Sequence, residues 1–367
     1  MTKPLKIIVS GGGTGGHIFP AISIANAIKK ELPDTEFLFV GAKGKMEMEK
    51  VPDAGFNIEG LWIDGIQRKL LSKRNLLFPF KLLSSIMDSS KIIKRFQPDL
   101  AIGVGGFASG PLLNVAARKR VPTLIQEQNS YPGITNKLLS KKVDKICVAY
   151  EGLERFFPKD KIIHTGNPVR AAIVEATFNK AEALAHFGFT ANKKTIFVTG
   201  GSLGARGINE GIKILLDYVR QNDIQLIWQC GKFYYEEMQQ HLKPTDTNIK
   251  LMAFVKRMDF AYAAADVIVC RAGAGTIAEL CIVGRPTILM PSPNVTEDHQ
   301  THNAMALVNK EAAKMVKDKD AKESLIPTVD AVLNDTELAQ KLADNIKGLA
   351  ITNAAAVIAK EALALIK

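Results

Sequence analysis

A run of glycines that ends in a histidine is the first stretch whose residue types could do chemistry. Residues 11–17 read Gly-Gly-Gly-Thr-Gly-Gly-His, after a strand-like run at residues 5–10 and before a helical pattern at residues 21–32. Glycines let a backbone approach a ligand closely, and the N–H groups at a helix start point toward negative oxygens, so the stretch predicts an anion site. No Lys-Ser or Lys-Thr pair follows the glycines, and no acidic residue ends the next strand at residues 37–41. The stretch therefore fits neither a P-loop nor a dinucleotide-binding turn.

His17 has two interpretations. At a helix N-terminus the dipole favours the neutral imidazole, which suits a general base that acts near pH 7. The alternative is a polar loop residue that is bonded to the backbone. Residue type and position alone leave both open.

A second candidate stretch covers residues 266–279. A strand ends at Cys270, small residues form the turn, and a helical pattern runs from Thr276 to residue 283, so a phosphate could approach this helix start as well. Glu279 lies about one turn into the helix. Its carboxylate could accept hydrogen bonds from both hydroxyls of a ribose, or it could merely interact with the helix dipole.

Three further groups of polar residues carry weaker signals. Residues 126–129 (Gln-Glu-Gln-Asn) follow a predicted strand, at the sheet edge where ligands usually bind, although ordinary loop polarity also explains them. Asp318-Lys319-Asp320 matches the metal-binding D-x-D pattern of some sugar transferases, but its charged surroundings at residues 317–323 fit a solvated loop better, and we expect no metal site. Cys147, Cys230, Cys270 and Cys281 lack CxxC spacing, which predicts buried reduced thiols and a cytoplasmic protein.

The elements that must position these residues alternate strand and helix in both halves of the chain, as in a doubly wound α/β fold. A second glycine loop lies at residues 103–111, a third opens the second half at residues 200–206, and the pattern pauses at residues 166–170. Two similar halves predict two Rossmann-like domains that face a cleft, with an Ala-rich helix at residues 348–367 that packs back on the first. The predicted strands are 5–10, 36–40, 99–104, 122–126 and 144–148 in the first half, and 194–199, 224–230, 249–253, 266–270 and 286–290 in the second.

Composition and charge narrow the class of protein. The 367 residues favour two domains, and 47% hydrophobic with 23% charged residues is ordinary for a soluble globular protein. Neither an apolar signal-peptide core nor an apolar run of about 18 residues is present, so we expect no secretion signal and no spanning helix.

The net charge is unevenly distributed. Residues 1–170 hold 26 Lys+Arg and 15 Asp+Glu, and therefore the whole net charge of +11, whereas residues 171–367 hold 22 of each. The first half is thus expected to meet something anionic, such as phospholipid or a phosphorylated substrate. A basic stretch at residues 66–74 runs into an apolar one at residues 76–83, which is typical of an interfacial membrane contact; a buried helix with a charged edge is the alternative.

Taken together, seven motifs in order make the chain resemble the family of N-acetylglucosaminyltransferases that act on undecaprenyl-pyrophosphoryl-N-acetylmuramyl-pentapeptide. These enzymes take N-acetylglucosamine from UDP-N-acetylglucosamine in the last cytoplasmic step of peptidoglycan precursor synthesis. The motifs are residues 12–17, residues 105–107 with 109–111, residues 127–129, residues 166–170, residues 200–205, Gly273-Ala274 with Thr276 and Glu279, and Gln300 with Asn303-Ala304.

The resemblance implies a GT-B fold, in which two Rossmann-like domains with parallel sheets face a central cleft. Residues 1–168 would form the domain that meets the acceptor and the membrane, with residues 348–367 packed back on it, and residues 169–347 would bind the UDP-sugar. The implied location is peripheral, on the cytoplasmic face of the cell membrane, with anionic inner-membrane lipids as partners and no nucleic acid.

The resemblance also implies site residues. His17 would be the catalytic base, Glu279 would hold the ribose, and Val255 would serve the uracil through its backbone. The implied substrate-binding residues are Thr14, Gly15, Gly16, Asn129, Arg170, Ser202, Val255, Ala274, Gly275, Thr276, Ile277, Ala278, Glu279 and Gln300. Two positions depart from the family's pattern: Gln126 replaces a frequent histidine and is expected to have no base role, and His299 replaces a frequent glutamine beside Gln300.

The reaction implied is a single inverting displacement, in which the acceptor 4-hydroxyl attacks the anomeric carbon, a base takes its proton and UDP leaves. No metal and no cofactor is expected, so helix N-termini, hydroxyls and Arg170 would stabilise the departing diphosphate. The alternatives are a transferase with a diacylglycerol acceptor, a nicotinamide-dependent dehydrogenase, which the missing acidic residue disfavours, and a nucleic-acid-binding protein, for which no recognition motif is present.

Overall fold

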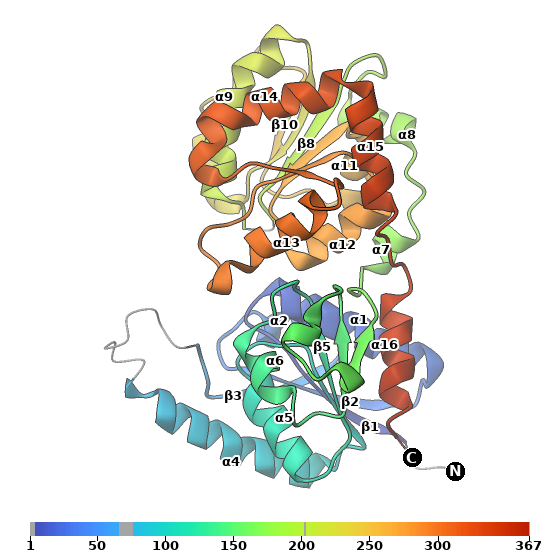
Figure 1. The fold of residues 1–367 in the computed structure, drawn as a ribbon. Helices are drawn as coiled ribbons and strands as arrows, with labels where there is room; N and C mark the ends of the chain where they lie inside the picture. The colour runs from blue at the N-terminus through green and yellow to red at the C-terminus, as the bar shows by residue number, and fades with distance from the viewer. Residues whose placement is uncertain (1–3, 66–75, 202, 367) are drawn as a thin grey trace. The chain divides into compact units, whose positions relative to one another are not determined.

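Short runs of β-branched and apolar residues, buried on both faces, form the parallel strands of two sheets. A computed structural model describes residues 4–65, 76–201 and 203–366. They divide into one unit made of Met1–Arg170 and Thr352–Lys367 and a second made of Ala171–Ile351. Figure 1 shows a sheet flanked by helices in each of them.

The first unit holds a parallel sheet whose strand order, among the described residues, is β3-β2-β1-β4-β5-β6-β7. Chain order reverses between β1 and β4, where Ile7 pairs with Phe37 on one side and with Leu100 on the other. Such a switch point is where open α/β sheets bind ligands. The strands are β1 (Lys6–Ser10), β2 (Glu36–Ala42), β3 (Asn57–Leu61), β4 (Leu100–Gly103), β5 (Thr123–Glu127), β6 (Lys145–Val148) and β7 (Ile162–His164).

Alternate side chains of these strands enter two cores, one on each face of the sheet. Ile8 belongs to the face that α4 and α5 cover, whereas Ile7 and Val9 belong to the face that α1 covers. The C-terminal helix α16 packs beside α1 on that second face (Figure 1), where Ile358 and Ala362 are fully buried. The helices of this unit are α1 (Gly15–Glu31), α2 (Glu47–Asp53), α4 (Phe78–Phe96), α5 (Ser109–Arg118), α6 (Ile134–Leu139) and α16 (Ala354–Leu363).

The second unit repeats the architecture with the strand order β10-β9-β8-β11-β12-β13 in its described residues. Its strands are β8 (Thr195–Thr199), β9 (Gln225–Gln229), β10 (Ile249–Met252), β11 (Val267–Cys270), β12 (Thr287–Leu289) and β13 (Lys314–Met315). Its helices are α7 (Ala171–Val174), α8 (Lys180–Phe187), α9 (Arg206–Gln221), α10 (Tyr235–Gln239), α11 (Met258–Ala264), α12 (Ala274–Val283), α13 (His299–Val308), α14 (Ala321–Asn334) and α15 (Thr336–Lys347).

The predicted fold class of two Rossmann-like halves with parallel sheets is confirmed, and so is each of the ten predicted strands. Three strands at the edges of the sheets, β3, β7 and β13, were not predicted. The four cysteines are buried and unpaired in disulfides, as expected. Burial raises the pKa of the Cys147, Cys270 and Cys281 thiols to about 12.

The first helix begins earlier than its apolar periodicity predicts. The pattern starts at Ala21, but α1 begins at Gly15 and keeps Pro20 inside it. Glycine and proline are poor helix formers, so helix propensity does not predict that Gly15, Gly16 and Pro20 belong to α1. His17 therefore lies in the first helical turn and not in the loop before it.

Candidate active site

The loop between β1 and α1 brings residues 11–14 to the carboxyl end of the first sheet. Gly13 has a φ of 86°, in the left-handed region. A Cβ on Gly12 would lie 2.1 Å from Oε1 of Glu47. The backbone at Gly13 therefore favours glycine, and a side chain at Gly12 would displace the Glu47 carboxylate. Thr14 precedes the helix in an extended conformation, so the backbone N–H groups of the first turn begin at Gly15 and Gly16, where the anion site was predicted.

His17 is held by this same loop. Its Nδ1 lies 3.0 Å from the carbonyl oxygen of Gly12 and 3.5 Å from Oγ1 of Thr14. Because a carbonyl oxygen can only accept, Nδ1 must carry the proton, and Nε2 is then the basic nitrogen of the neutral ring. The bond to the backbone that the simpler interpretation predicts is present, and it orients the ring in the tautomer that a base needs.

The loop after β4 closes against this histidine. Gly105 has a φ of 90°. A Cβ there would come within 3.0 Å of Nε2 and Cδ2 of the His17 ring. The glycine thus lets the second loop of the sheet approach the ring edge closely.

Glu127, the last residue of β5, is a buried carboxylate that shapes the next loop. Its Oε1 accepts hydrogen bonds from N (3.0 Å) and Nδ2 (3.1 Å) of Asn129. Its Oε2 accepts from N of Gly133 (3.1 Å) and Nδ2 of Asn136 (2.9 Å). Burial raises the pKa of Glu127, and these four bonds oppose the shift. Glu127 therefore fixes the position of Asn129, one of the predicted substrate contacts.

Gln126, which was expected to have no base role, is fully buried. Its Nε2 donates to Oδ1 of Asn167 at 2.9 Å, and Asn167 in turn donates to the carbonyl oxygen of Gln128 at 2.9 Å. The side chain thus connects β5 to the segment after β7. Arg170, the last residue of that segment, is exposed.

In the second unit, the loop after β8 leads into α9 as the first loop leads into α1. Gly204 has a φ of 75°. A Cβ on it would lie 2.0 Å from the carbonyl oxygen of Cys230. Gln229 donates to Oγ1 of Thr199 and to the carbonyl oxygen of Gly201, each at 3.0 Å, which ties β9 to this loop. Ser202, predicted to contact the diphosphate, lies outside the described residues, and so does the whole predicted basic stretch at residues 66–74.

The same Gln229 also fixes Val255. Its Oε1 accepts a hydrogen bond from the backbone N–H of Val255 at 2.8 Å. Because the Val255 N–H donates to Gln229, the carbonyl group of Val255 is the part of its backbone that would bind a uracil.

The turn between β11 and α12 places the third set of predicted residues. Gly273 stands at the helix N-cap in an extended conformation, and α12 begins at Ala274, two residues earlier than predicted. Glu279 is half-buried on this helix, and its Oε2 accepts a hydrogen bond from the Tyr262 hydroxyl at 3.1 Å. The Tyr262 bond gives the carboxylate a defined orientation, which a residue that only balances the dipole would not require.

The D-x-D sequence proves to be more than a solvated loop. Arg271, just after β11, pairs with both carboxylate oxygens of Asp318 and also donates to the carbonyl oxygens of Met290 and Pro291. The two side chains are 12% and 20% exposed. Asp318 therefore has a structural partner, and the expectation that it is merely solvated was wrong. Within the described residues, no group of three or more His, Cys, Asp or Glu could hold a metal ion.

Gln300 and its neighbours lie on α13, which follows two residues with left-handed backbone, Glu297 (φ 54°) and Asp298 (φ 49°). Oε1 of Gln300 accepts a hydrogen bond from the backbone N–H of Ser292 at 2.9 Å. The fully buried Asn303 donates to the carbonyl oxygen of Ala272 at 3.3 Å, which joins α13 to the turn before α12.

In each unit, the structure thus places predicted residues at the carboxyl edge of the sheet. In the first unit, residues 14–17 and Asn129 follow β1 and β5, at the carboxyl edge of one sheet. In the second unit, residues 274–279 and Gln300 follow β11 and β12, at the carboxyl edge of the other.

Sequence reasoning missed the residues that position these loops, namely Glu47, Gln229, Tyr262, Asn136 and Arg271. Each is a polar residue that acts through the main chain or through another side chain. A charged or polar residue on a helix or strand is normally assigned to the solvated face. A single sequence holds no signal that would have distinguished them.

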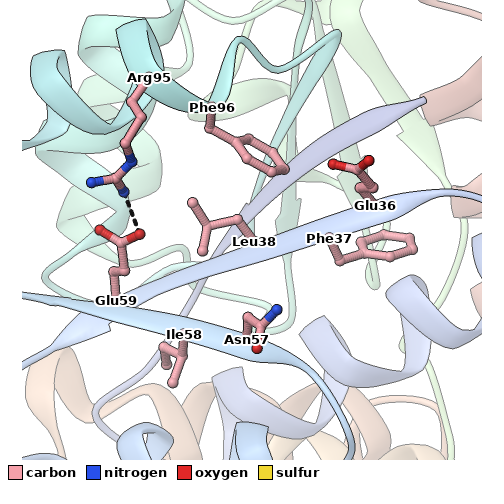
Figure 2. A pocket seen from close by; sticks show the side chains of 8 residues that line it. All are labelled: Glu36, Phe37, Leu38, Asn57, Ile58, Glu59, Arg95 and Phe96. Atoms are coloured by element: carbon pink, nitrogen blue, oxygen red, sulfur yellow. Dashed lines mark hydrogen bonds and ion pairs between the residues drawn. The ribbon is translucent and has the colours of Figure 1, made fainter. Parts of the chain in front are cut away.

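A surface hollow in the first unit lies away from these loops. Figure 2 shows it between the first residues of β2 and β3 and the last turn of α4, with the Arg95–Glu59 ion pair at its wall. The amino ends of the strands line it, whereas the glycine loops follow the carboxyl ends. We therefore do not assign it to the site. The lining residues are Glu36, Phe37, Leu38, Asn57, Ile58, Glu59, Arg95 and Phe96.

Helix α4 presents an unusually apolar exposed stripe. Phe80 is 67% exposed and Leu83 is 59% exposed. Phe78 and Leu82, by contrast, pack against the core, so the apolar run predicted at residues 76–83 divides between two faces of one helix. Lys81 is buried and pairs with Asp64 at 2.6 Å. Among the described residues, no helix has the length and apolar character needed to cross a membrane. The exposed residues of the stripe are Phe80, Leu83 and Met87 on the helix, together with Leu76 and Leu77 directly before it.

Comparison with known proteins gives consistent matches along the chain. The glycosyltransferase family 28 N-terminal domain matches residues 7–148, and the glycosyltransferase family 28 C-terminal domain matches residues 195–361. A protein from Flavobacterium psychrophilum is 52% identical over 364 residues, which cover 99% of this chain and 98% of that protein. One from Cytophaga hutchinsonii is 57% identical over 344 residues, which cover 94% and 92%. Both are named UDP-N-acetylglucosamine--N-acetylmuramyl-(pentapeptide) pyrophosphoryl-undecaprenol N-acetylglucosamine transferase.

Solved structures agree with these matches. The crystal structure of Acinetobacter baumannii MurG is similar with a TM-score of 0.80 and 25% identity, over 98% of this chain and 100% of that one. The calicheamicin glycosyltransferase CalG4 reaches a TM-score of 0.74 at 12% identity, over 99% of this chain and 98% of that one, which shows the fold alone.

Proposed function

The chain belongs to glycosyltransferase family 28, and from this premise we propose that it transfers N-acetylglucosamine from UDP-N-acetylglucosamine to undecaprenyl-pyrophosphoryl-N-acetylmuramyl-pentapeptide. The product is the complete lipid-linked disaccharide precursor of peptidoglycan. The observation that carries this function is the identity of 52–57% to enzymes of that name over more than nine-tenths of the chain. The GT-B fold of two Rossmann-like domains agrees with it.

We assign the UDP-sugar to the second domain, residues 169–347. The N-terminal turn of α12, at residues 274–278, would bind the diphosphate through main-chain N–H groups, and Glu279 would accept from the ribose hydroxyls. Gln300 would contact the sugar, and the Val255 carbonyl would accept from the uracil. The Tyr262 bond to Glu279 and the Gln229 bond to Val255 support these roles, because each fixes one predicted contact.

We assign the acceptor and the base to the first domain, residues 1–168 with the C-terminal helix. The proton of the acceptor 4-hydroxyl moves to Nε2 of His17 as the oxygen forms its bond to the anomeric carbon. The bond from that carbon to the phosphate oxygen breaks at the same time, with inversion, and UDP leaves with the electron pair. Within this domain, the main-chain N–H groups at Gly15 and Gly16 would bind negatively charged oxygens of the substrate. The Nδ1–H tautomer of His17 supports the base role, since it leaves Nε2 as the proton acceptor.

We further propose that the enzyme works at the cytoplasmic face of the membrane, to which it binds peripherally through α4. The acceptor has a long polyprenyl chain, so the reacting sugar stays near the bilayer surface. The stripe that includes Phe80 and Leu83 would enter the acyl boundary, and the excess positive charge of residues 1–170 would attract anionic lipids.

The function is tested by transfer of radiolabelled N-acetylglucosamine from its UDP conjugate to purified acceptors. Transfer to the lipid-linked muramyl-pentapeptide is expected, with none to diacylglycerol, and the new glycosidic bond should be β if the donor is α-linked. Transfer to diacylglycerol alone would reject the acceptor assignment, and retention of configuration would reject the single displacement.

A further inference from the structure

Glu47 is a buried carboxylate at the start of α2 that contacts the loop between β1 and α1. It is 1% exposed. Its Oε1 accepts from the backbone N–H of Ala42 at 3.0 Å, and its Oε2 accepts from the backbone N–H of Gly13 at 2.8 Å. Main-chain N–H groups thus bind both of its oxygens.

The neighbouring backbone makes room for this side chain. A Cβ on Gly12 would lie 2.1 Å from the carboxylate, and a Cβ on Gly41 would lie 2.5 Å from its Cγ. Gly41 of β2 and Gly12 of the loop between β1 and α1 therefore enclose Glu47. Such close packing holds the carboxylate in one place relative to the loop.

Glu47 and His17 bind opposite ends of one peptide group. The N–H that Glu47 accepts belongs to Gly13, and the carbonyl oxygen that accepts from Nδ1 of His17, at 3.0 Å, belongs to Gly12. These two atoms are joined in the same planar trans amide, which points its N–H and its C=O in opposite directions. Carboxylate, amide and imidazole thus form a continuous chain of two hydrogen bonds.

We propose that Glu47 is a positioning residue that acts on His17 through the Gly12–Gly13 peptide group, an inference that rests on the base role of His17 proposed above. A carboxylate that accepts from the amide N–H increases the negative charge on the amide oxygen, because consecutive hydrogen bonds polarise one another. The stronger acceptor holds the proton on Nδ1 and keeps Nε2 basic. It also stabilises the imidazolium that forms when Nε2 takes the acceptor's proton. In serine hydrolases a carboxylate does this by direct contact with the imidazole.

The test compares Glu47→Gln with Glu49→Gln, which removes the same charge from an exposed position of the same helix. Glu47→Gln is expected to lower kcat about 5- to 50-fold, less than the loss from His17→Ala, with the donor KM within about twofold. The ring ¹⁵N signals of His17 should show the Nδ1–H tautomer in the wild type and a smaller share of it in Glu47→Gln. Glu49→Gln should change neither quantity.

A double-mutant cycle separates action through His17 from support of the loop. In the His17→Ala background, Glu47→Gln should lower kcat by less than about twofold, because the imidazole that Glu47 acts on is absent. An equal loss in both backgrounds would overturn the proposal, and so would the Nε2–H tautomer in the wild-type protein, a measurement that needs no variant. A small effect of His17→Ala on turnover would instead reject the base role, so the two failures are distinguishable.

Discussion

Replacing Asp318 by alanine should destabilise the second unit without removing a catalytic group. Arg271 would lose its two bonds to the carboxylate and keep only the carbonyl oxygens of Met290 and Pro291. Breaking a buried pair by deleting one partner costs about 3–5 kcal/mol, and the 12% and 20% exposure of these side chains reduces this to about 2–4 kcal/mol. For a domain of this size the melting temperature should fall by about 4–16 °C. Differential scanning calorimetry measures this shift.

The matched control is Asp320→Ala, in the same D-x-D sequence. Asp320 precedes α14 without a side-chain capping bond, so its loss should cost less than about 1 kcal/mol and leave transfer activity within about threefold of the wild type. A D-x-D metal site would give the reverse pattern, in which both variants lose activity and neither loses much stability. An unchanged melting temperature for Asp318→Ala, or an inactive Asp320→Ala, would refute the structural role.

Three further outcomes are expected. Glu279→Gln should weaken UDP-N-acetylglucosamine binding about 10- to 100-fold by titration calorimetry, through loss of a charge-assisted bond to ribose, and unchanged affinity would remove Glu279 from the site. His17→Ala should lower kcat about 10²- to 10⁴-fold in the transfer assay with a much smaller change in donor KM, and a loss below tenfold would contradict the base role. Phe80→Ser with Leu83→Ser should release the protein from anionic vesicles at high salt while it still acts on a water-soluble acceptor analogue; cosedimentation equal to that of the wild type would show that α4 is not the anchor.

The sequence predicted the strands and the glycine loops because each has a local cause. A β-branched run such as Ile7-Ile8-Val9 is buried wherever the sheet forms, and a left-handed turn such as that at Gly13 demands glycine. The contacts of Glu47 and Asp318 have no local cause. Glu47 bonds a residue 34 positions away, and Asp318 bonds one 47 positions away. Only the folded chain brings these partners together, and a carboxylate on a helix looks the same in sequence whether it is solvated or enclosed.

The exposed stripe of α4 is a second case in which the sequence shows the residue types but not which of them are exposed. An apolar run beside basic residues indicates either a membrane contact or a buried helix, and the structure supports a part of each interpretation. Phe78 and Leu82 are partly buried and pack against the core, whereas Leu77, Phe80 and Leu83 are exposed. The helical register decides which residues face the core and which face solvent. A variant that tests membrane binding must therefore leave Phe78 and Leu82 unchanged.

The packing of α16 has a consequence for the order in which the molecule is made. Ile358, Ala359 and Ala362 complete the same core as Ile7 and Ile18, so the first unit contains residues from the start of the chain and from residues after 351. On a ribosome that adds about 5–20 residues per second, the helix emerges roughly 10–40 s after Arg170. The second unit is complete before then. The nascent first unit must therefore wait with the part of its core beside α1 uncovered, and that interval is when chaperones or aggregation would compete with folding.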